Sequence, residues 1–391
     1  MKSSSRSRHV SSSRCPSRGF SLIELMVAIT LGLLLTAGLV QLFSATRVTF
    51  NTNDALARVQ ENGRFALENL KSALREAGTL GFCAGQVPIT SHLNTGCSGG
   101  IDDFFNPDFS VVGWEYAGTG LTESYTLPTD LDPGTASASD WDSSANSPDL
   151  PTQLSGLVSP GSDVLVTRNL VVVDSFTADP LNPHDPDEDI TLTASSELRD
   201  NSVLLITDCS SADLFQNTAG PSDSKLSSSG GSCSSPGPGN DGSIDWSTTY
   251  NDSMQTFRIE QVAYYIGVND AGEPGLYRWN MSNGTAAARA EEIIEGAENL
   301  QILYGFSRVA PDGDGQHVNN WLSADEIPTD GWPQVIALRV GMSVRSTERG
   351  DLDNSDITLD LASAQITAPG DGRIRQGFST AVALRNRVLV Q

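Results

Sequence analysis

The sequence predicts an α+β fold, in which one long N-terminal helix packs on a mainly antiparallel β-sheet domain with long loop insertions. Two patterns predict this fold. An apolar run that begins at residue 20 continues into a proline-free amphipathic stretch as far as residue 77, which is the pattern of a long helix. After Gly81 the chain changes to short β-type runs separated by Gly, Pro, Ser and Asp, which is typical of strands joined by turns.

The first part of the chain is basic and precedes a run of membrane-spanning length. Residues 1–19 hold five basic residues and no acidic residue. Between Glu24 and Arg47 lie 22 residues without a charge. As a helix this run would be roughly 33 Å long, enough to cross a bilayer core. Basic residues before the run and an acidic body after it predict a cytoplasmic N-terminus and a body outside the inner membrane.

Three interpretations of this segment compete. A secretory signal peptide needs a shorter apolar region and a small-x-small cleavage site beyond it, and Thr36-Ala37-Gly38 is a weak candidate inside the run. A plain signal anchor fits the length but leaves Glu24 unexplained. A carboxylate five residues into the span costs about 2.5–3.5 kcal/mol, so it is expected to have a partner. Glu24 therefore indicates a function.

The third interpretation comes from the stretch Arg18-Gly19-Phe20-Ser21-Leu22-Ile23-Glu24. It resembles the type III signal of type IV pilins and type II secretion pseudopilins. The resemblance implies that a membrane aspartyl peptidase cuts after Gly19 and methylates Phe20. Glu24 is then the fifth mature residue, whose carboxylate is expected to meet the N-terminal amine of a neighbouring subunit. Two charges that are each costly in lipid become tolerable when they pair.

The helix is expected to continue beyond the membrane. From Phe20 to Ala77 it would be about 85 Å long, and Gly78 is its expected stop. Asn51, Asn53 and Gly63 weaken the helix locally, so a bend near these residues is an alternative to a straight helix. Its apolar stripe, expected to pack on a sheet, consists of Leu56, Val59, Leu67, Leu70 and Leu74.

The expected organisation has four parts. A basic leader at 1–19 is followed by a transmembrane half of the helix at 20–45, an outer half at 46–78 and a β-rich globular domain at 79–391. Residues 118–160 and 210–254 are poor in apolar residues and are predicted to be long loops or insertions. The predicted strands are Asp163–Val173, Ser202–Thr207, Phe257–Val268, Gly275–Asn280, Asn299–Phe306, Gln334–Arg345 and Phe378–Val390.

Several stretches along the body carry a second resemblance. They include Asn62–Leu67, Leu204–Cys209, Tyr264-Tyr265-Ile266, Gly275–Arg278, Gly296–Gln301, Val344-Arg345-Ser346 and Ala383–Arg387. In this order they resemble PilW-type minor pilins. They read equally well as strand and turn residues, so none is assigned a binding role.

The cysteines indicate disulfides. Cys15 lies in the leader, and removal of the leader leaves an even number in an exported chain, which favours two disulfides. Loop-closure cost favours Cys83–Cys97 and Cys209–Cys233 among the three pairings. Free buried thiols are the alternative, and zinc is disfavoured because no CxxC spacing is present.

Charge and motifs exclude several classes of function. Residues 20–391 carry 19 basic against 48 acidic side chains, a net charge of −29, so nucleic acid is not an expected partner. The four histidines are isolated, and no catalytic or cofactor-binding motif is present, so no enzyme is expected. Asp312, Asp314 and the acidic turn 185–189 are weak calcium candidates, against the alternative of solvated turns.

The expected function is that of a non-enzymatic minor pilin in a type IV pilus, in the priming or tip complex. Its size, 372 residues after cleavage, argues against the bulk subunit. The expected partners are other major and minor pilins, the prepilin peptidase and the inner-membrane assembly machinery. A type II secretion pseudopilin is the first alternative. The second is an adhesin or ligand-binding tip protein that uses the insertions.

Overall fold

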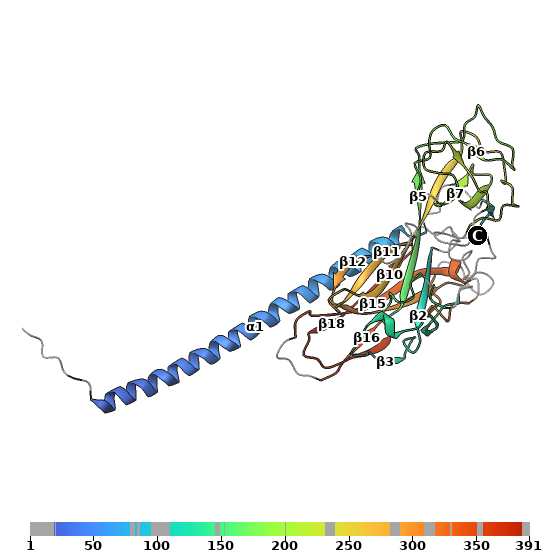
Figure 1. Cartoon of the computed structure of the whole chain (residues 1–391). Coiled ribbons are helices and arrows are strands. Elements are labelled where there is room, and N and C mark those ends of the chain that lie inside the picture. The colour runs from blue at the N-terminus through green and yellow to red at the C-terminus, as the bar shows by residue number, and fades with distance from the viewer. Residues whose placement is uncertain are drawn as a thin grey trace, which may run out of the picture. The chain divides into compact units, whose positions relative to one another are not determined.

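The chain divides into two compact units, Met1–Asn53 and Asp54–Gln391. One continuous helix, α1 (Leu22–Glu76), contributes residues to both (Figure 1). The computed structural model describes residues 19, 21–78, 83, 87–94, 110–144, 149–151, 153–199, 201–230, 239–281, 290–308, 317–328, 331–349 and 355–384. The helix predicted for residues 20–77 is thus confirmed, and Asn51, Asn53 and Gly63 all lie inside it without interrupting it.

In the first unit the helix presents its side chains to the surroundings. Every residue from Ser21 to Asn51 is exposed, including the leucines of the apolar run. The helix is long and apolar enough to cross a membrane, by length and composition.

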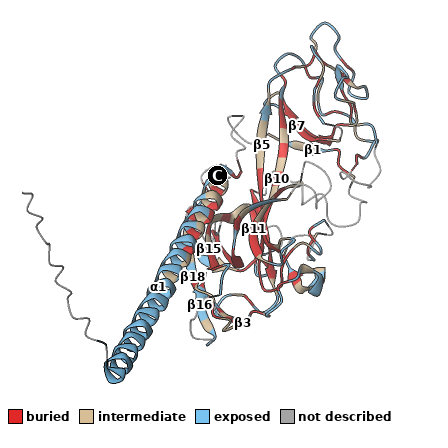
Figure 2. Cartoon of the chain, turned by 60° about the vertical axis from the view of Figure 1, so that its left-hand side comes forward, coloured by how far each residue is buried: buried red, intermediate tan, exposed pale blue. Residues whose placement is uncertain are grey.

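In the second unit the helix buries one face, which differs in part from the predicted stripe. Leu56 is 36% exposed and Leu67 is only partly buried, whereas two small residues replace them on the packed face. Residues smaller than leucine let the helix axis lie closer to the strands. The buried residues of the helix are Val59, Gly63, Ala66, Leu70 and Leu74 (Figure 2).

Gly63 is the point of closest approach on this face. A Cβ built on Gly63 would lie 2.3 Å from Cε2 of Phe378. The aromatic ring therefore occupies the space that any other side chain would need. The glycine that weakens the helix locally is what permits it to pack here.

The helix ends where the sequence predicts. Gly78 has a φ of +74°, in the left-handed region that suits glycine at a helix C-terminus. Its backbone N–H donates to the carbonyl oxygen of Arg168 at 2.9 Å, so the end of the helix is joined to a strand.

The largest sheet has nine strands among the described residues, and all its pairings but one are antiparallel. Two strands branch from the main path, β11 (Pro274–Asn280) beside β10 and β12 (Glu291–Glu295) beside β11. The main path runs in the order β1 (Ile89–Ser91), β8 (Ala212–Gln216), β7 (Val203–Thr207), β10 (Gln255–Val268), β5 (Val164–Val173), β2 (Val111–Tyr116) and β4 (Trp141–Asp142).

Three smaller sheets and three short 3₁₀ turns complete the described elements. A four-stranded antiparallel sheet has the order β14 (Asn320–Leu322), β13 (Ala297–Phe306), β15 (Val335–Arg345) and β18 (Arg375–Ala383). A three-stranded sheet has the order β16 (Ile357–Leu361), β17 (Ala364–Ala368) and β3 (Ser124–Thr126), and a two-stranded one joins β6 (Ile190–Thr191) to β9 (Lys225–Leu226). The 3₁₀ turns are η1 (Pro133–Thr135), η2 (Ala138–Asp140) and η5 (Trp332–Gln334).

The main core joins the helix to the strands. Buried side chains of α1 form one apolar cluster with those of β2, β5, β10, β11, β13 and β15. The predicted arrangement of one long helix on a mainly antiparallel β-sheet domain is confirmed. All seven predicted strands are present with ends shifted by a few residues, although the predicted end of the last one, residues 385–390, lies outside the described residues.

The interpretation of residues 210–254 as a long loop was wrong at β8. This strand is buried along its whole length, although its sequence Ala-Asp-Leu-Phe-Gln carries two polar side chains. Those side chains are buried because they have hydrogen-bond partners: Asp213 bonds to His92, and the Gln216 amide donates to the carbonyl of Asn201 and accepts from the backbone N–H of Gly239. Residues 118–160 hold only the short elements β3, β4, η1 and η2 among the described residues.

Residues 174–254, here called the acidic lobe, have an apolar core of their own. Phe176, Ile190, Phe215, Trp246 and Tyr250 are all buried in it. The lobe contains 14 acidic and two basic side chains in its sequence. The insertion near 210–254 is therefore part of a packed element rather than a free loop.

Candidate functional site

The N-terminus of α1 is closed by a reciprocal pair of hydrogen bonds. The Ser21 hydroxyl accepts from the backbone N–H of Glu24 at 3.2 Å, and Oε2 of Glu24 accepts from the backbone N–H of Ser21 at 3.1 Å. The Ser21 hydroxyl also lies 3.2 Å from the same carboxylate oxygen and donates to it. Serine at the cap with glutamate three residues later is a capping box. Ser21 is thus a functional residue that the sequence analysis missed, although Ser-x-x-Glu was visible in the sequence.

This arrangement gives Glu24 a local role in addition to the expected one. Its carboxylate satisfies a backbone donor that has no partner within the helix, and its charge lies at the positive end of the helix dipole. Both carboxylate and cap are exposed in the single chain, so an external amine can reach them. Gly19 lies two residues before the cap, and Phe20 lies outside the described residues.

Two threonine side chains within the apolar run are hydrogen-bonded inside the helix. Thr30 donates its hydroxyl to the carbonyl of Val27 at 2.9 Å, and Thr36 donates to that of Gly32 at 2.7 Å. Such bonds remove the cost of an unpaired hydroxyl in an apolar medium. Among the charged side chains of the helix, Glu24 alone lies within the apolar run.

The predicted disulfide pairing was wrong. Cys83 is bonded to Cys209, with the two Cα atoms 5.4 Å apart, so neither residue bonds to its nearest neighbour in the sequence. The pairing follows from the sheet: β1 pairs in parallel with β8, which brings the segment before β1 to the turn between β7 and β8. Cys97 and Cys233 lie outside the described residues.

The weak calcium candidates gain no support from the described residues. Asp312 and Asp314 lie outside them. In the turn 185–189, Asp189 accepts from Nζ of Lys225 at 2.7 Å. Within the described ranges, no three His, Cys, Asp or Glu side chains gather as a metal site would require.

Two histidines that look isolated in the sequence meet other groups inside the acidic lobe or at its edge. Nε2 of His92 lies 2.8 Å from Oδ1 of Asp213, and both side chains are fully buried. Oδ2 of Asp213 accepts from the hydroxyls of Ser247 and Tyr250, each at 2.5 Å. His184 accepts the backbone N–H of Tyr250 through Nε2. The buried carboxylate therefore holds the segment 247–250 against β8, which is a structural use.

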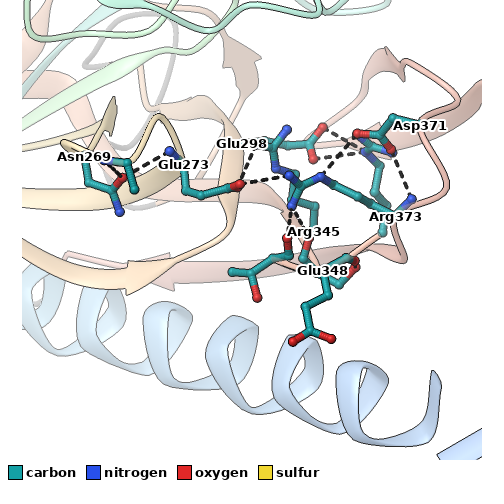
Figure 3. Close-up of polar contacts among 11 residues, drawn as sticks. Asn269, Glu273, Glu298, Arg345, Glu348, Asp371 and Arg373 are labelled. Atoms are coloured by element: carbon teal, nitrogen blue, oxygen red, sulfur yellow. Dashed lines mark hydrogen bonds and ion pairs between the residues drawn. The ribbon is translucent and has the colours of Figure 1, made fainter. Parts of the chain in front are cut away.

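A second charged network links β13, β15, the start of β18 and the turn between β10 and β11 (Figure 3). Glu273, in the turn between β10 and β11, pairs with Arg345 at 2.9 Å and with Arg373 at 2.8 Å. Arg375 pairs with Glu298 at 3.0 Å, and both of these side chains are 1% exposed. The two arginines hold the pKa of Glu273 below its usual value, although burial alone would raise it. Asp371 also pairs with Arg375, with 2.6 Å between Oδ1 of Asp371 and Nη1 of Arg375.

This network fastens β10, β13, β15 and β18 to one another. Nη1 of Arg373 donates to the carbonyl of Ser346 at 2.8 Å and also to the carbonyl of Thr347. Every charge in it has an opposite partner, so its burial is compensated. These paired charges make the network a structural clamp.

Comparisons with known proteins match two regions of the chain, one at its N-terminus and one in the body. Residues 263–386 match the family model of the type IV pilus-assembly protein W. Residues 14–40 match the prokaryotic N-terminal methylation motif, which includes Gly19, Phe20 and Glu24. A search of curated proteins gives no match. Among solved structures, a type IV-like pilin from Thermus thermophilus is 19% identical, with 33% of this chain and 69% of that chain covered and a TM-score of 0.22.

The two family matches fit the geometry. The first contains the capped start of α1 and the apolar run. The second contains the clamp of Glu273, Arg345 and Arg373, together with β11, β13, β15 and β18. One match thus covers the apolar first part of α1, and the other covers strands of the body. The chain is thus similar to the type IV pilus-assembly protein W over residues 263–386 and carries a match to the prokaryotic N-terminal methylation motif at residues 14–40.

Proposed function

We propose that the chain is cut after Gly19 by a prepilin peptidase and then joins other pilins in the priming or tip complex of a type IV pilus. The observation that carries the proposal is the position of Glu24. Glu24 lies in the first turn of a helix of membrane-spanning length, three residues after the N-cap residue Ser21. The similarity of the chain to pilus proteins supports a structural rather than an enzymatic role.

The geometry supports a simple mechanism. Cleavage after Gly19 would create a free amine on Phe20, one residue before the cap. That amine and the Glu24 carboxylate of a neighbouring subunit are opposite charges, each costly in lipid, and they become tolerable when paired. The exposed apolar face of residues 22–51 would stay in apolar contact as the helix leaves the bilayer for a bundle of similar helices. The acidic body is proposed to lie in the periplasm and later at the cell surface.

Intact mass tests the cleavage. The full chain, expressed with and without an active prepilin peptidase, is expected to lose residues 1–19 and to gain one methyl group only when the peptidase is present. Gly19→Ile, which alters only the last leader residue, is the matched control and should stay uncut. An uncut N-terminus in the presence of active peptidase contradicts the proposal.

Two substitutions separate the cap from subunit pairing. Glu24→Gln keeps an acceptor for the backbone N–H of Ser21 but removes the charge, whereas Ser21→Ala removes the hydroxyl of the cap and keeps the charge. We expect Glu24→Gln to lower incorporation into sheared pili strongly and Ser21→Ala to lower it little, because only the first abolishes the ion pair. Equal incorporation of Glu24→Gln and the unaltered chain would show that the carboxylate serves the helix cap alone.

A second function, ligand binding at the surface of the pilus, is favoured by one observation. The acidic lobe has a separate core, so it is a built unit rather than a spacer. Because β8 belongs to that core, deletion of residues 210–254 would unfold the lobe and test nothing. Exposed substitutions such as Leu181→Ser, at a side chain that is 87% exposed, are the suitable probe. Loss of adhesion with normal piliation would support this second function.

A further inference from the structure

The strand β5 has an outer edge that is only half covered. It pairs with β10 from Leu165 to Val173, but β2 covers its other side only from Val164 to Thr167. Arg168 makes the last contacts on that side, since its N–H donates to the carbonyl of Ser110 and its carbonyl accepts from Gly78. Among the described residues, no strand pairs with this side of β5 beyond Arg168.

The alternation of a strand decides which backbone groups face outward. The backbone N–H and C=O groups of Arg168 point away from β10. Those of Leu170 and Val172, two and four residues later, therefore point the same way. Their N–H and C=O groups therefore lie along the uncovered edge. This edge reads Leu170-Val171-Val172-Val173 and carries no charge and no proline, the usual devices that protect an edge strand from pairing.

An apolar hollow lies against these residues. Its volume is about 440 Å³. Val172 is 65% exposed beside it. The apolar lining consists of Leu170, Val172, Val173, Phe176, Met254 and Phe257. An uncovered strand edge with an adjacent apolar hollow has the two parts that strand addition uses, namely backbone pairing for affinity and a pocket for alternate side chains.

Charge indicates what kind of chain can pair there. Asp174 follows the edge directly and is exposed, and it begins the acidic lobe with its 14 acidic and two basic side chains. Two copies of this chain that met edge to edge would bring two such lobes together, and their repulsion disfavours that pairing. A basic partner would instead be attracted and steered to the edge.

We propose that residues 170–173 of β5 form a docking edge for an extended segment of another protein, apolar at alternate positions and flanked by lysine or arginine. The segment adds a strand beside β5, places an apolar side chain in the hollow and sets its basic flank against the acidic lobe. The edge lies outside residues 263–386 and outside the N-terminal helix, so this interaction is separate from the helix contacts that build a fibre.

Peptide binding to the full chain in detergent micelles tests the edge. The probe is the fluorescently labelled peptide Lys-Lys-Val-Thr-Val-Thr-Val-Lys, and its binding is followed by fluorescence anisotropy. We expect saturable binding that weakens about tenfold or more for a fully N-methylated copy, which keeps the side chains but has no backbone donors. A copy with glutamate in place of each lysine should also bind more weakly, and less so at high salt.

Substitutions at one position provide matched controls. Val172→Pro removes an outward N–H, which a strand edge tolerates, and should weaken binding about tenfold with an unchanged melting temperature. Val172→Thr keeps the backbone and the shape and should change binding much less. If Val172→Pro fails to fold, Val172→Lys places a like charge beside the basic peptide at an exposed position and should abolish binding.

Three results would overturn the proposal. Equal binding of the N-methylated peptide would exclude strand pairing, and equal binding of the glutamate peptide would exclude a basic partner. Concentration-dependent dimers in sedimentation experiments that disappear in Val172→Pro would show that the edge serves a second copy of this chain.

Discussion

At the scale of single residues, two buried acids, Asp163 and Glu115, both contact the hydroxyl of Thr119. Asp163 is 1% exposed and accepts the backbone N–H groups of Ile302 at 2.7 Å and Tyr116 at 3.2 Å. Glu115 is 5% exposed and accepts the hydroxyl of Thr119. Burial raises the pKa of Asp163 to about 8. Burial, and then the charge of Asp163, raise the pKa of Glu115 well above its ordinary value.

These raised pKa values predict that stability falls as pH rises. Between about pH 4, where a free Asp ionises, and pH 8, the folded chain binds protons that the unfolded chain has released. The free energy of unfolding should therefore decrease across this window, by up to about 1.4 kcal/mol per pH unit for each such proton. Asp163→Asn should flatten the dependence, because the amide cannot ionise and can still accept one backbone hydrogen bond.

Melting temperatures of the full chain in detergent at pH 5, 6.5 and 8 measure this effect. Asp252→Asn, at an exposed position, is the control and should leave the pH dependence unchanged. An Asp163→Asn variant that loses as much stability as the unaltered chain between pH 5 and 8 would show that Asp163 is already ionised at the lower pH.

At the scale of elements, the contact between α1 and β18 depends on the absence of a side chain. Gly63 lies on the buried face of the helix, and the ring of Phe378 fills the space above it. Helix propensity alone favours alanine over glycine by about 1 kcal/mol. Packing opposes that preference here, since Phe378 is itself packed against the main core and has to move.

Gly63→Ala is therefore expected to destabilise the body by about 1–3 kcal/mol, because overpacking exceeds the gain in helix propensity. Thermal unfolding monitored by circular dichroism measures the change. Gly38→Ala is the control, because nothing lies within 4 Å of the added methyl group in the single chain. The double variant Gly63→Ala with Phe378→Leu should recover part of the loss, and a Gly63→Ala variant as stable as the Gly38→Ala variant would contradict the packing argument.

At the scale of the whole molecule, the disulfide joins distant parts of the sequence. Cys83 and Cys209 are 126 residues apart, and their bond closes a loop that contains β1, β2, β5 and β7. Closing so long a loop restricts the unfolded chain, and loss of a native disulfide from a secreted domain typically costs about 2–5 kcal/mol. The loss of stability is expected mainly in the acidic lobe, because the disulfide holds the turn between β7 and β8.

The double variant Cys83→Ser with Cys209→Ser tests this. It is expected to unfold at a lower temperature and to be cut by trypsin first at Arg199 or Lys225, the two basic residues of the lobe. The unaltered chain treated with dithiothreitol should also unfold at a lower temperature and be cut at the same sites. Equal protease resistance of the two chains without reductant would show that the sheet holds the lobe without the bond.

Sequence patterns predicted local features well and long-range ones poorly. The apolar run, Gly78 and the strand at 255–268 each depend on neighbours in the sequence, and all three are present. The disulfide between Cys83 and Cys209 depends on the parallel pairing of β1 with β8. An argument from loop length alone cannot predict which strands pair. β8 escaped detection because its buried Asp213 is satisfied by partners 34 to 121 residues away. The same limit hid Ala66 and Gly63, since small residues look neutral until the partner strand is known.

The junction at Gly78 has a mechanical consequence. In the proposed fibre, a load carried by α1 reaches β5 at Arg168 through the hydrogen bond from Gly78. β5 pairs with β10 over nine residues, so this load is shared among the hydrogen bonds of the β5–β10 pairing. The main core shares it as well, because buried side chains of α1 pack with those of β5 and β10.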